Sequence, residues 1–287
     1  RAGRRTWRAL AVDLALMLPS LGFIVLFFGY PLVLNVLRSI GLAPFTGVPR
    51  YTLEHYQRLL NARLYHDSAV FTVWVAVGTT LVSLVIAIPL SVVVRYSFPG
   101  KALYMALSKV PLMIPGVVVI FLFFAIAGRG ALLTQLFERI GWTLPNLVHD
   151  RGGWGVIIAQ AWGDVPFMVL IISSVMVSIS SDLVEAARNL GASGWRVLWH
   201  VLIPMALPGI TAATLLEFVR VFGAYAIPAA VGPIYPTPLP ALLQREAFDR
   251  GHWEMAAAIA NVMVVPSAVV LILYYLGFKR REGLGRR

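Results

Sequence analysis

The sequence predicts an all-α membrane protein with six membrane-spanning helices. Of its 287 residues, 59% are hydrophobic and 13% are charged, whereas about a quarter of the residues in a typical soluble domain carry a charge. Six stretches with at most two charged residues each are also long enough to cross a hydrocarbon core about 30 Å thick. The composition therefore excludes an ordinary soluble domain of this length.

The six predicted spans cover residues 14–37, 69–94, 110–127, 155–179, 205–231 and 255–278. The third is the shortest and carries Pro111, Pro115 and Gly116, so we expect an irregular start. Prolines at positions 89, 166, 228 and 266 are expected to interrupt other spans, which a membrane tolerates where protein or a wet cavity satisfies the freed carbonyl groups. We expect residues 1–287 to form a single transmembrane domain.

The distribution of basic residues predicts the orientation in the membrane. An even number of spans places both termini on one side, and segments on that side hold fourteen Lys and Arg residues, against nine on the opposite side. Because cytoplasmic loops carry the excess of Lys and Arg, both termini are predicted to be cytoplasmic. The net charge of +11 is then explained by topology and by attraction to anionic membrane lipid, so nucleic acid is not an expected partner.

Two outer loops have distinct patterns in this orientation. The first, residues 38–68, contains a short amphipathic helix predicted at 53–60. The last, residues 232–254, opens with the sequence GPIYPTPLP, whose proline density precludes a regular helix at its start. We expect Thr237 in this loop to be accessible from outside.

The cytoplasmic segment between the fourth and fifth spans, about residues 180–204, is short, polar and helical in pattern. Gly191 and Gly194 allow a turn, so two short helices are predicted, the second with an apolar face that ends before Pro204. A helical hairpin of this kind suits docking into a groove on a soluble partner. The alternative is an interfacial hairpin that has no partner.

This segment resembles the signature of the permease subunits of binding-protein-dependent ABC importers. That signature is Glu-Ala-Ala, three residues, Gly, nine residues, and Ile-x-Leu-Pro. Here the matching residues are Glu185, Ala186, Ala187, Gly191 and Pro204, while Val201 and Ile203 replace the Ile and the Leu. The resemblance implies a six-span permease fold with cytoplasmic coupling helices between the fourth and fifth spans, and it assigns contact with an ATPase to these five matching residues.

The resemblance also implies the partners of the chain. These are two ATPase subunits that hold ATP and Mg, a second permease that is homologous or identical, and an external solute-binding protein, with the complex in the bacterial plasma membrane. The residues 218–228 look more like the spermidine/putrescine branch than the maltose branch, which implies a polyamine-like cation as the solute. Sugar, phosphonate or iron importers of the same class are alternatives, and an ion-gradient-driven secondary carrier is the alternative from another class.

No enzymatic site is predicted in this chain. It lacks the G-x-x-x-x-G-K-[ST] loop that cradles nucleotide phosphates, so ATP hydrolysis is expected in separate subunits and no cofactor is expected here. The sequence contains no cysteine, and its five histidines show no spacing typical of a metal site.

Three charged residues fall inside the predicted spans. Asp164 costs at least a few kcal/mol there unless it is paired, hydrated or protonated. It is either a contact for a cationic solute or a water chain in the pathway, or a structural group that caps amides near Pro166 or pairs with an arginine of a partner subunit. Glu217 and Arg220 are three residues apart, which favours an intrahelical ion pair.

The alternative for Glu217 is a role at the substrate pathway together with Tyr225, since both fall near the middle of the predicted fifth span. Asn261 is a lone amide in the sixth span, and such amides more often join helices than bind ligands.

Overall fold

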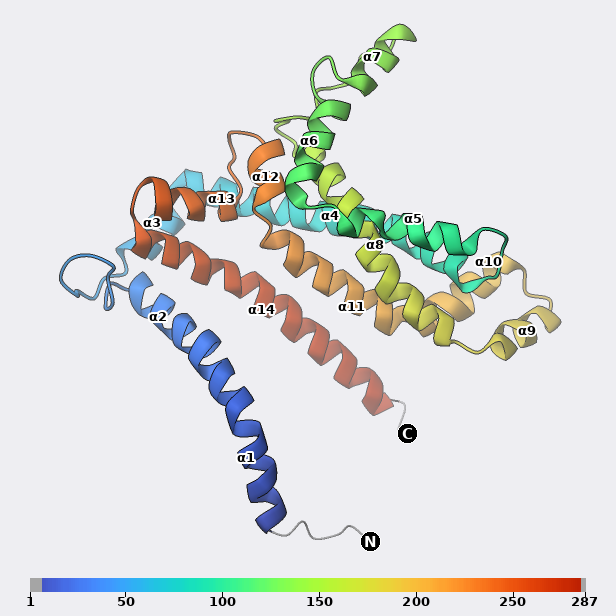
Figure 1. Ribbon diagram of the computed structural model, residues 1–287, viewed down its shortest axis with the longest axis horizontal. Helices are drawn as coiled ribbons and strands as arrows, with labels where there is room; N and C mark the ends of the chain where they lie inside the picture. The colour runs from blue at the N-terminus through green and yellow to red at the C-terminus, as the bar shows by residue number, and fades with distance from the viewer. Residues whose placement is uncertain (1–6, 285–287) are drawn as a thin grey trace. The chain divides into compact units, whose positions relative to one another are not determined.

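The computed structural model describes residues 7–284, which form helices joined by turns and loops (Figure 1). In chain order the helices are α1 (Trp7–Ile24), α2 (Tyr30–Ser39), α3 (Glu54–Asn61), α4 (Arg63–Arg95), α5 (Lys101–Met113), α6 (Gly116–Ala127), α7 (Leu132–Arg139), α8 (Trp154–Ser178), α9 (Ser181–Asn189), α10 (Gly194–Val197), α11 (Ile203–Phe222), α12 (Ala226–Val231), α13 (Leu239–Gln244) and α14 (Trp253–Leu284). π-Helical turns at Val25–Gly29 and Leu198–Leu202 make α1–α2 and α10–α11 continuous, and a third follows α13 at Arg245–Asp249.

Six helical stretches among the described residues are long and apolar enough to cross a membrane. They are Ala15–Ser39, Arg63–Arg95, Gly116–Arg139, Trp154–Ser178, Gly194–Phe222 and Trp253–Ile272. They correspond in order to the six predicted spans, which confirms the predicted all-helical membrane fold.

The fifth span differs in extent from its prediction. Its helix begins at Gly194 and ends at Phe222, so it starts earlier and stops sooner than the predicted 205–231. The chain breaks at Gly223 and resumes as the separate helix α12, which contains Pro228. Hydropathy continues across this break, which is why composition alone placed the end too late.

The proline predictions are correct in one span and wrong in others. The third span has the expected irregular start, because α5 ends at Met113 and α6 begins at Gly116, directly after Pro115. Prolines 89, 166 and 266, in contrast, lie inside the continuous helices α4, α8 and α14 and do not interrupt them.

Both predicted loop features are present, but one residue is placed differently. Helix α3 confirms the predicted amphipathic helix, and the proline-rich start of the last loop is irregular as far as α13. The Tyr235 hydroxyl donates a hydrogen bond to the Asp67 carboxylate, which raises the pKa of Tyr235. Thr237 is only 4% exposed, so the expected accessibility is wrong, whereas its neighbour Ile234 is 79% exposed.

The chain divides into two compact units. Among the described residues, the first comprises 7–62 and Leu243–Val262, and the second comprises Arg63–Leu242 and 263–284. Helix α14 contributes to both units. The second unit contains the segment between the fourth and fifth spans and all three charged residues of the predicted spans.

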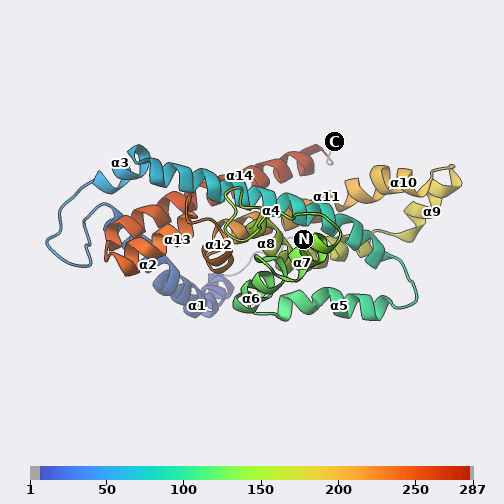
Figure 2. The ribbon, with the colours of Figure 1, turned by 90° about the horizontal axis from the view of Figure 1, so that it is seen from above.

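The second unit is built on α4, α8 and α11, which pack side by side (Figure 1, Figure 2). The buried face of α4 consists largely of small and hydroxyl residues at helical spacing, whereas its exposed face carries Val77, Leu81 and Val85. Small residues let helix backbones approach closely, and apolar residues suit lipid. The small residues on the buried face are Ser68, Thr72, Ala76, Thr79, Thr80, Ser83, Ala87 and Ser91.

Several hydroxyl groups on this face are satisfied within the helix itself. Thr72, Thr80 and Ser91 each donate to the carbonyl four residues earlier, at 2.7 Å. Two glycines show how closely the helices approach. A β-carbon at Gly78 of α4 would collide with Ile157 of α8, and one at Gly209 of α11 would collide with Val175 of α8. The small residues on α4 therefore let the three helices pack closely around the larger buried side chains of α8, such as Met168 and Ile172.

The first unit contains a polar network between α2, α3 and α14. The Asn35 amide donates to the Asn261 side-chain oxygen at 2.7 Å, and the Asn261 amide donates to the Ser39 hydroxyl at 2.8 Å and the Tyr56 hydroxyl at 3.0 Å. The Ser39 and Tyr56 hydroxyls also bond to each other at 2.8 Å. Asn261 thus joins helices, as predicted.

Replacing Asn261 by alanine should destabilise the first unit. Three hydrogen bonds are lost, and the side chains of Asn35, Ser39 and Tyr56 each lose their bond to Asn261. At about 1 kcal/mol for each such bond, the midpoint of thermal unfolding in detergent should fall by several degrees. The control is Val262→Ala, since Val262 lies next to Asn261 and is 37% exposed. Equal midpoints for the two variants would contradict a structural role for this network.

Candidate functional site

The segment between the fourth and fifth spans, residues 180–204 and hereafter the coupling segment, folds as a helix, a turn and the start of a long helix. Helix α9 begins after Ser180, whose hydroxyl accepts a hydrogen bond from the Asp182 amide at 3.2 Å. The turn after α9 contains Gly191 with φ +80°. Its amide donates to the Arg188 carbonyl at 2.9 Å. A left-handed φ favours glycine, so Gly191 is required by backbone geometry.

The predicted second helix of the segment is not a separate helix. Helix α10 starts at Gly194, where the Ser193 hydroxyl accepts from the Arg196 amide at 3.4 Å, and continues through the π-helical turn into α11. Pro204 follows the π-helical turn and lies inside the continuous helical stretch Gly194–Phe222, so it does not end a helix. The expected two-helix hairpin is therefore one helix joined by a turn to an extension of the fifth span.

The coupling segment lies at one end of the α4, α8 and α11 group (Figure 2). Val184, Val197 and Leu202 are buried in one apolar cluster with Met176 and Ile179 at the end of α8. These contacts seat the coupling segment on the ends of the spans.

The outward side of the coupling segment presents several apolar side chains. Leu190 is 89% exposed and Trp195 is 69% exposed, and the Trp195 and Trp199 rings pack edge to face with centroids 5.5 Å apart. Glu185 and Ala186 are also exposed, while Ala187 is half-buried. Exposed apolar groups rimmed by polar residues are typical of a protein–protein contact.

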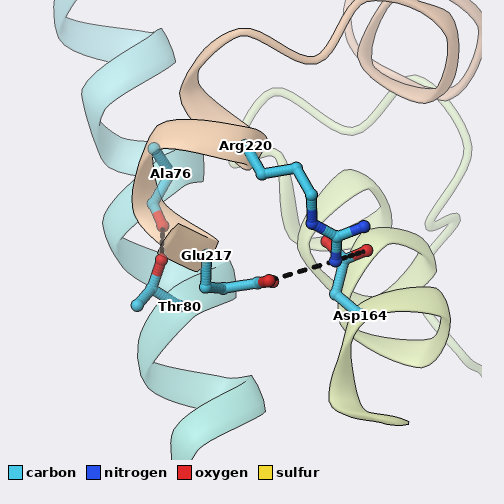
Figure 3. Close-up of polar contacts among 5 residues, drawn as sticks. All are labelled: Ala76, Thr80, Asp164, Glu217 and Arg220. Carbon is cyan, nitrogen blue, oxygen red and sulfur yellow. Dashed lines mark hydrogen bonds and ion pairs between the residues drawn. The ribbon is translucent and has the colours of Figure 1, made fainter. Parts of the chain in front are cut away.

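A second polar site lies inside the α8–α11 pair. The Arg220 guanidinium bonds to the Glu217 carboxylate at 3.0 Å and also forms an ion pair with Asp164 of α8 (Figure 3). Glu217 is fully buried and Asp164 is 8% exposed. The face of the Arg220 guanidinium stacks over the Phe167 ring, 4.9 Å from its centroid, where a cation–π contact adds to the ion pairs.

The predicted Glu217–Arg220 ion pair is thus confirmed, and Asp164 has a partner within this chain that was not predicted. It shares Arg220 with Glu217 within this chain. A sequence signal for this contact existed, because Arg220 is the one basic residue inside the six predicted spans. We refer to Asp164, Glu217 and Arg220 as the charge cluster, and its formal charge is −1 when both carboxyl groups are ionised.

Tyr225 is not part of the charge cluster. It lies in the break after α11, is 46% exposed, and its carbonyl accepts from the Ala229 amide at 2.9 Å in the first turn of α12. Glu217 is correspondingly close to the end of α11 and not in the middle of a span as predicted. The structure therefore brings Asp164 and Glu217 together and leaves Tyr225 outside.

Comparison with known proteins identifies the family. Residues 80–282 match the family described as binding-protein-dependent transport system inner membrane component. The chain is 32% identical over 204 residues to the molybdenum transport system permease protein ModB of Escherichia coli K12, which covers 67% of this chain and 84% of that protein. It is 29% identical over 209 residues to the probable sulfate transport system permease protein of Marchantia polymorpha, covering 70% and 69%.

Similarity also extends over nearly the whole chain. The inner membrane ABC transporter permease protein YdcU of Escherichia coli K12 is 27% identical over 292 residues, covering 96% of this chain and 90% of that protein. The fold matches a bacterial ABC transporter involved in the import of alginate with a TM-score of 0.79 at 16% identity, covering 96% of this chain and 99% of the other. The chain therefore belongs to the family of inner membrane components of binding-protein-dependent transport systems.

Proposed function

We propose that this permease subunit transmits ATP-driven movement through its coupling segment to the helices that carry a solute across the membrane. The observation that supports this most directly is the seating of residues 180–204. The segment packs on the end of α8, continues directly into α11, and exposes Leu190 and Trp195 for a partner. Glu185, Ala186, Ala187, Gly191 and Pro204 remain the residues proposed for coupling.

The proposed partners follow from the family. Two ATPase subunits would supply hydrolysis of ATP with Mg²⁺, because this chain has no phosphate-binding loop. A second permease and an external solute-binding protein would complete the complex, and one structure of the similar alginate importer is described as a complex with a substrate-bound periplasmic protein. In the proposed orientation both termini and the coupling segment are cytoplasmic, in the plasma membrane of a bacterium. Family membership favours ATP-driven transport over transport driven by an ion gradient.

The solute is proposed to be a small oxyanion of the sulfate or molybdate kind and not a polyamine. Relatives named for sulfate and molybdenum transport support this class. The two carboxylates in the spans that favoured a cation, Asp164 and Glu217, both pair with Arg220. The charge cluster is not a ready anion site either, since its formal charge is −1. We infer that it is structural and that other residues, together with the binding protein, set specificity.

The solute proposal can be tested by ATPase activity in complexes reconstituted with the cognate binding protein. Sulfate or molybdate should stimulate hydrolysis and spermidine should not. Asp164→Asn should keep this order and most of the transport rate, because Arg220 retains Glu217 and the cluster becomes neutral. If spermidine stimulates hydrolysis and neither sulfate nor molybdate does, the oxyanion proposal is rejected. If the solutes rank differently in Asp164→Asn than in wild type, the structural role of the cluster is rejected.

Replacing Gly191 by valine should abolish or greatly reduce transport while membrane insertion is unchanged. The cause is backbone strain and not a steric clash. A β-carbon at position 191 would meet no atom within 4 Å, but a left-handed φ costs about 1–2 kcal/mol for most L residues. Gly191→Asn should transport better than Gly191→Val, because asparagine tolerates this conformation. Gly194→Ala is the control, as Gly194 also has open space and no positive φ. Transport by Gly191→Val at the wild-type rate in a fully assembled complex would contradict the coupling role.

Cysteine labelling of this cysteine-free chain tests the proposed orientation. A cysteine at Ile234 should react with an impermeant reagent added from outside, and a cysteine at Leu190 should react only after permeabilisation. Both side chains are well exposed, at 79% and 89%, so accessibility within the protein does not limit either reaction. The reverse pattern would invert the topology.

A further inference from the structure

The connection between α8 and α9 is short. Helix α8 ends at Ser178, Ile179 is extended with φ −71° and ψ 126°, and Ser180 already caps α9. Only Ile179 and Ser180 therefore separate a membrane span from the first helix of the coupling segment. The last carbonyl groups of α8 have no partners within that helix and need donors from elsewhere.

Arg95, the last residue of α4, supplies one of these donors and also bonds to a carbonyl group beyond α8. One guanidinium nitrogen donates to the Met176 carbonyl in the last turn of α8, and the other donates to the Ser180 carbonyl at 3.4 Å. The Val175 carbonyl is satisfied separately by the Ser178 hydroxyl at 2.7 Å. Arg95 thus contacts both sides of the junction, with one contact on α8 and the other on the residue that caps α9.

An arginine is well suited to this position. Its planar guanidinium presents several N–H groups in a fixed fork and stays charged, whereas lysine is a point charge on a flexible stem. The cation also lies at the carbonyl ends of α4 and α8, where the helix dipoles favour positive charge.

The surroundings connect Arg95 to the proposed ATPase contact. Val94, next to Arg95, is buried in the same apolar cluster as Met176, Ile179 and Val184. A polar pocket of about 380 Å³ is lined by Arg95 together with Glu185 and Arg188 of α9. The apolar contacts hold α9 against the spans, and the guanidinium adds directional contacts that fix the junction itself.

We propose that Arg95 is a positioning residue for energy coupling. By joining the end of α4 to both sides of the α8–α9 junction, it makes α4, α8 and α9 move together when an ATPase subunit displaces the coupling segment. Without it, α9 would turn about Ile179 and Ser180 and part of the displacement would not reach the spans. This inference rests on the proposed function of the coupling segment.

The first measurement uses the permease alone. A nitroxide label on a cysteine at Leu190 should become more mobile in Arg95→Met, which keeps the aliphatic stem and removes the donors. Arg95→Lys should give an intermediate spectrum. The control is Arg139→Met, because Arg139 is an exposed arginine in the last turn of α7. Identical label mobility in wild type and Arg95→Met would overturn the proposed clamp.

The second measurement uses complexes reconstituted with the ATPases and the binding protein. In Arg95→Met the number of solute molecules transported per ATP hydrolysed should fall roughly tenfold, the scale of a hydrogen bond to a charged group. Hydrolysis itself should continue, Arg139→Met should match wild type, and Arg95→Lys should recover part of the ratio. If the Arg95→Met complex does not assemble, the Arg95→Lys complex provides the test. A transport ratio equal to that of wild type in Arg95→Lys would then overturn the proposal.

The outcomes separate this inference from the proposed function. An unchanged transport ratio in Arg95→Met, with wild type active, would reject the role of Arg95 and leave the coupling segment standing. Wild-type complexes that show no ATP-driven transport would instead reject the proposed function, and the coupling role of Arg95 with it.

Discussion

Close approach of α4, α8 and α11 is the constraint on which the second unit depends. In a membrane, apolar side chains gain little by leaving lipid, so helices associate through shape and polar contacts. The small and hydroxyl residues along α4 provide that shape, and the hydroxyl groups of Thr72, Thr80 and Ser91 bond to carbonyl groups of their own helix. Larger residues on this face would push α4 away from α8 and α11. The contacts that α4 makes with these two helices would then be lost.

Polar links then tie the packed helices at separate levels. The charge cluster joins α8 to α11 within the spans, and Arg95 joins α4 to α8 at the end that carries the coupling segment. Each link places its arginine among oxygen acceptors, because an unpaired charge at these positions would be costly. The result is a set of helices that respond to a displacement of the coupling segment as a group.

Features with local partners could be predicted from the sequence, and features with distant partners could not. The six spans, helix α3, the broken third span and the Glu217–Arg220 pair all follow from composition or from spacing along one helix. The Asp164–Arg220 contact joins two separate helices, so spacing along one helix does not predict it, and the only signal was that Arg220 is the one basic residue in the predicted spans. The burial of Thr237 likewise depends on how a loop folds back, which its polarity does not reveal. The early end of the fifth span was missed because hydropathy does not change at Gly223.

The exposed apolar side chains of the coupling segment have a consequence for how the cell handles this subunit. Leu190 and Trp195 are exposed on the surface of this subunit. In the proposed orientation they face the cytoplasm, where chaperones and proteases act on unfolded or unassembled chains. A permease made in excess of its ATPases would display this surface, and an assembled one would cover it. The residues proposed to dock the partner would therefore also mark unassembled copies for degradation, which would match the amount of permease to the amount of ATPase.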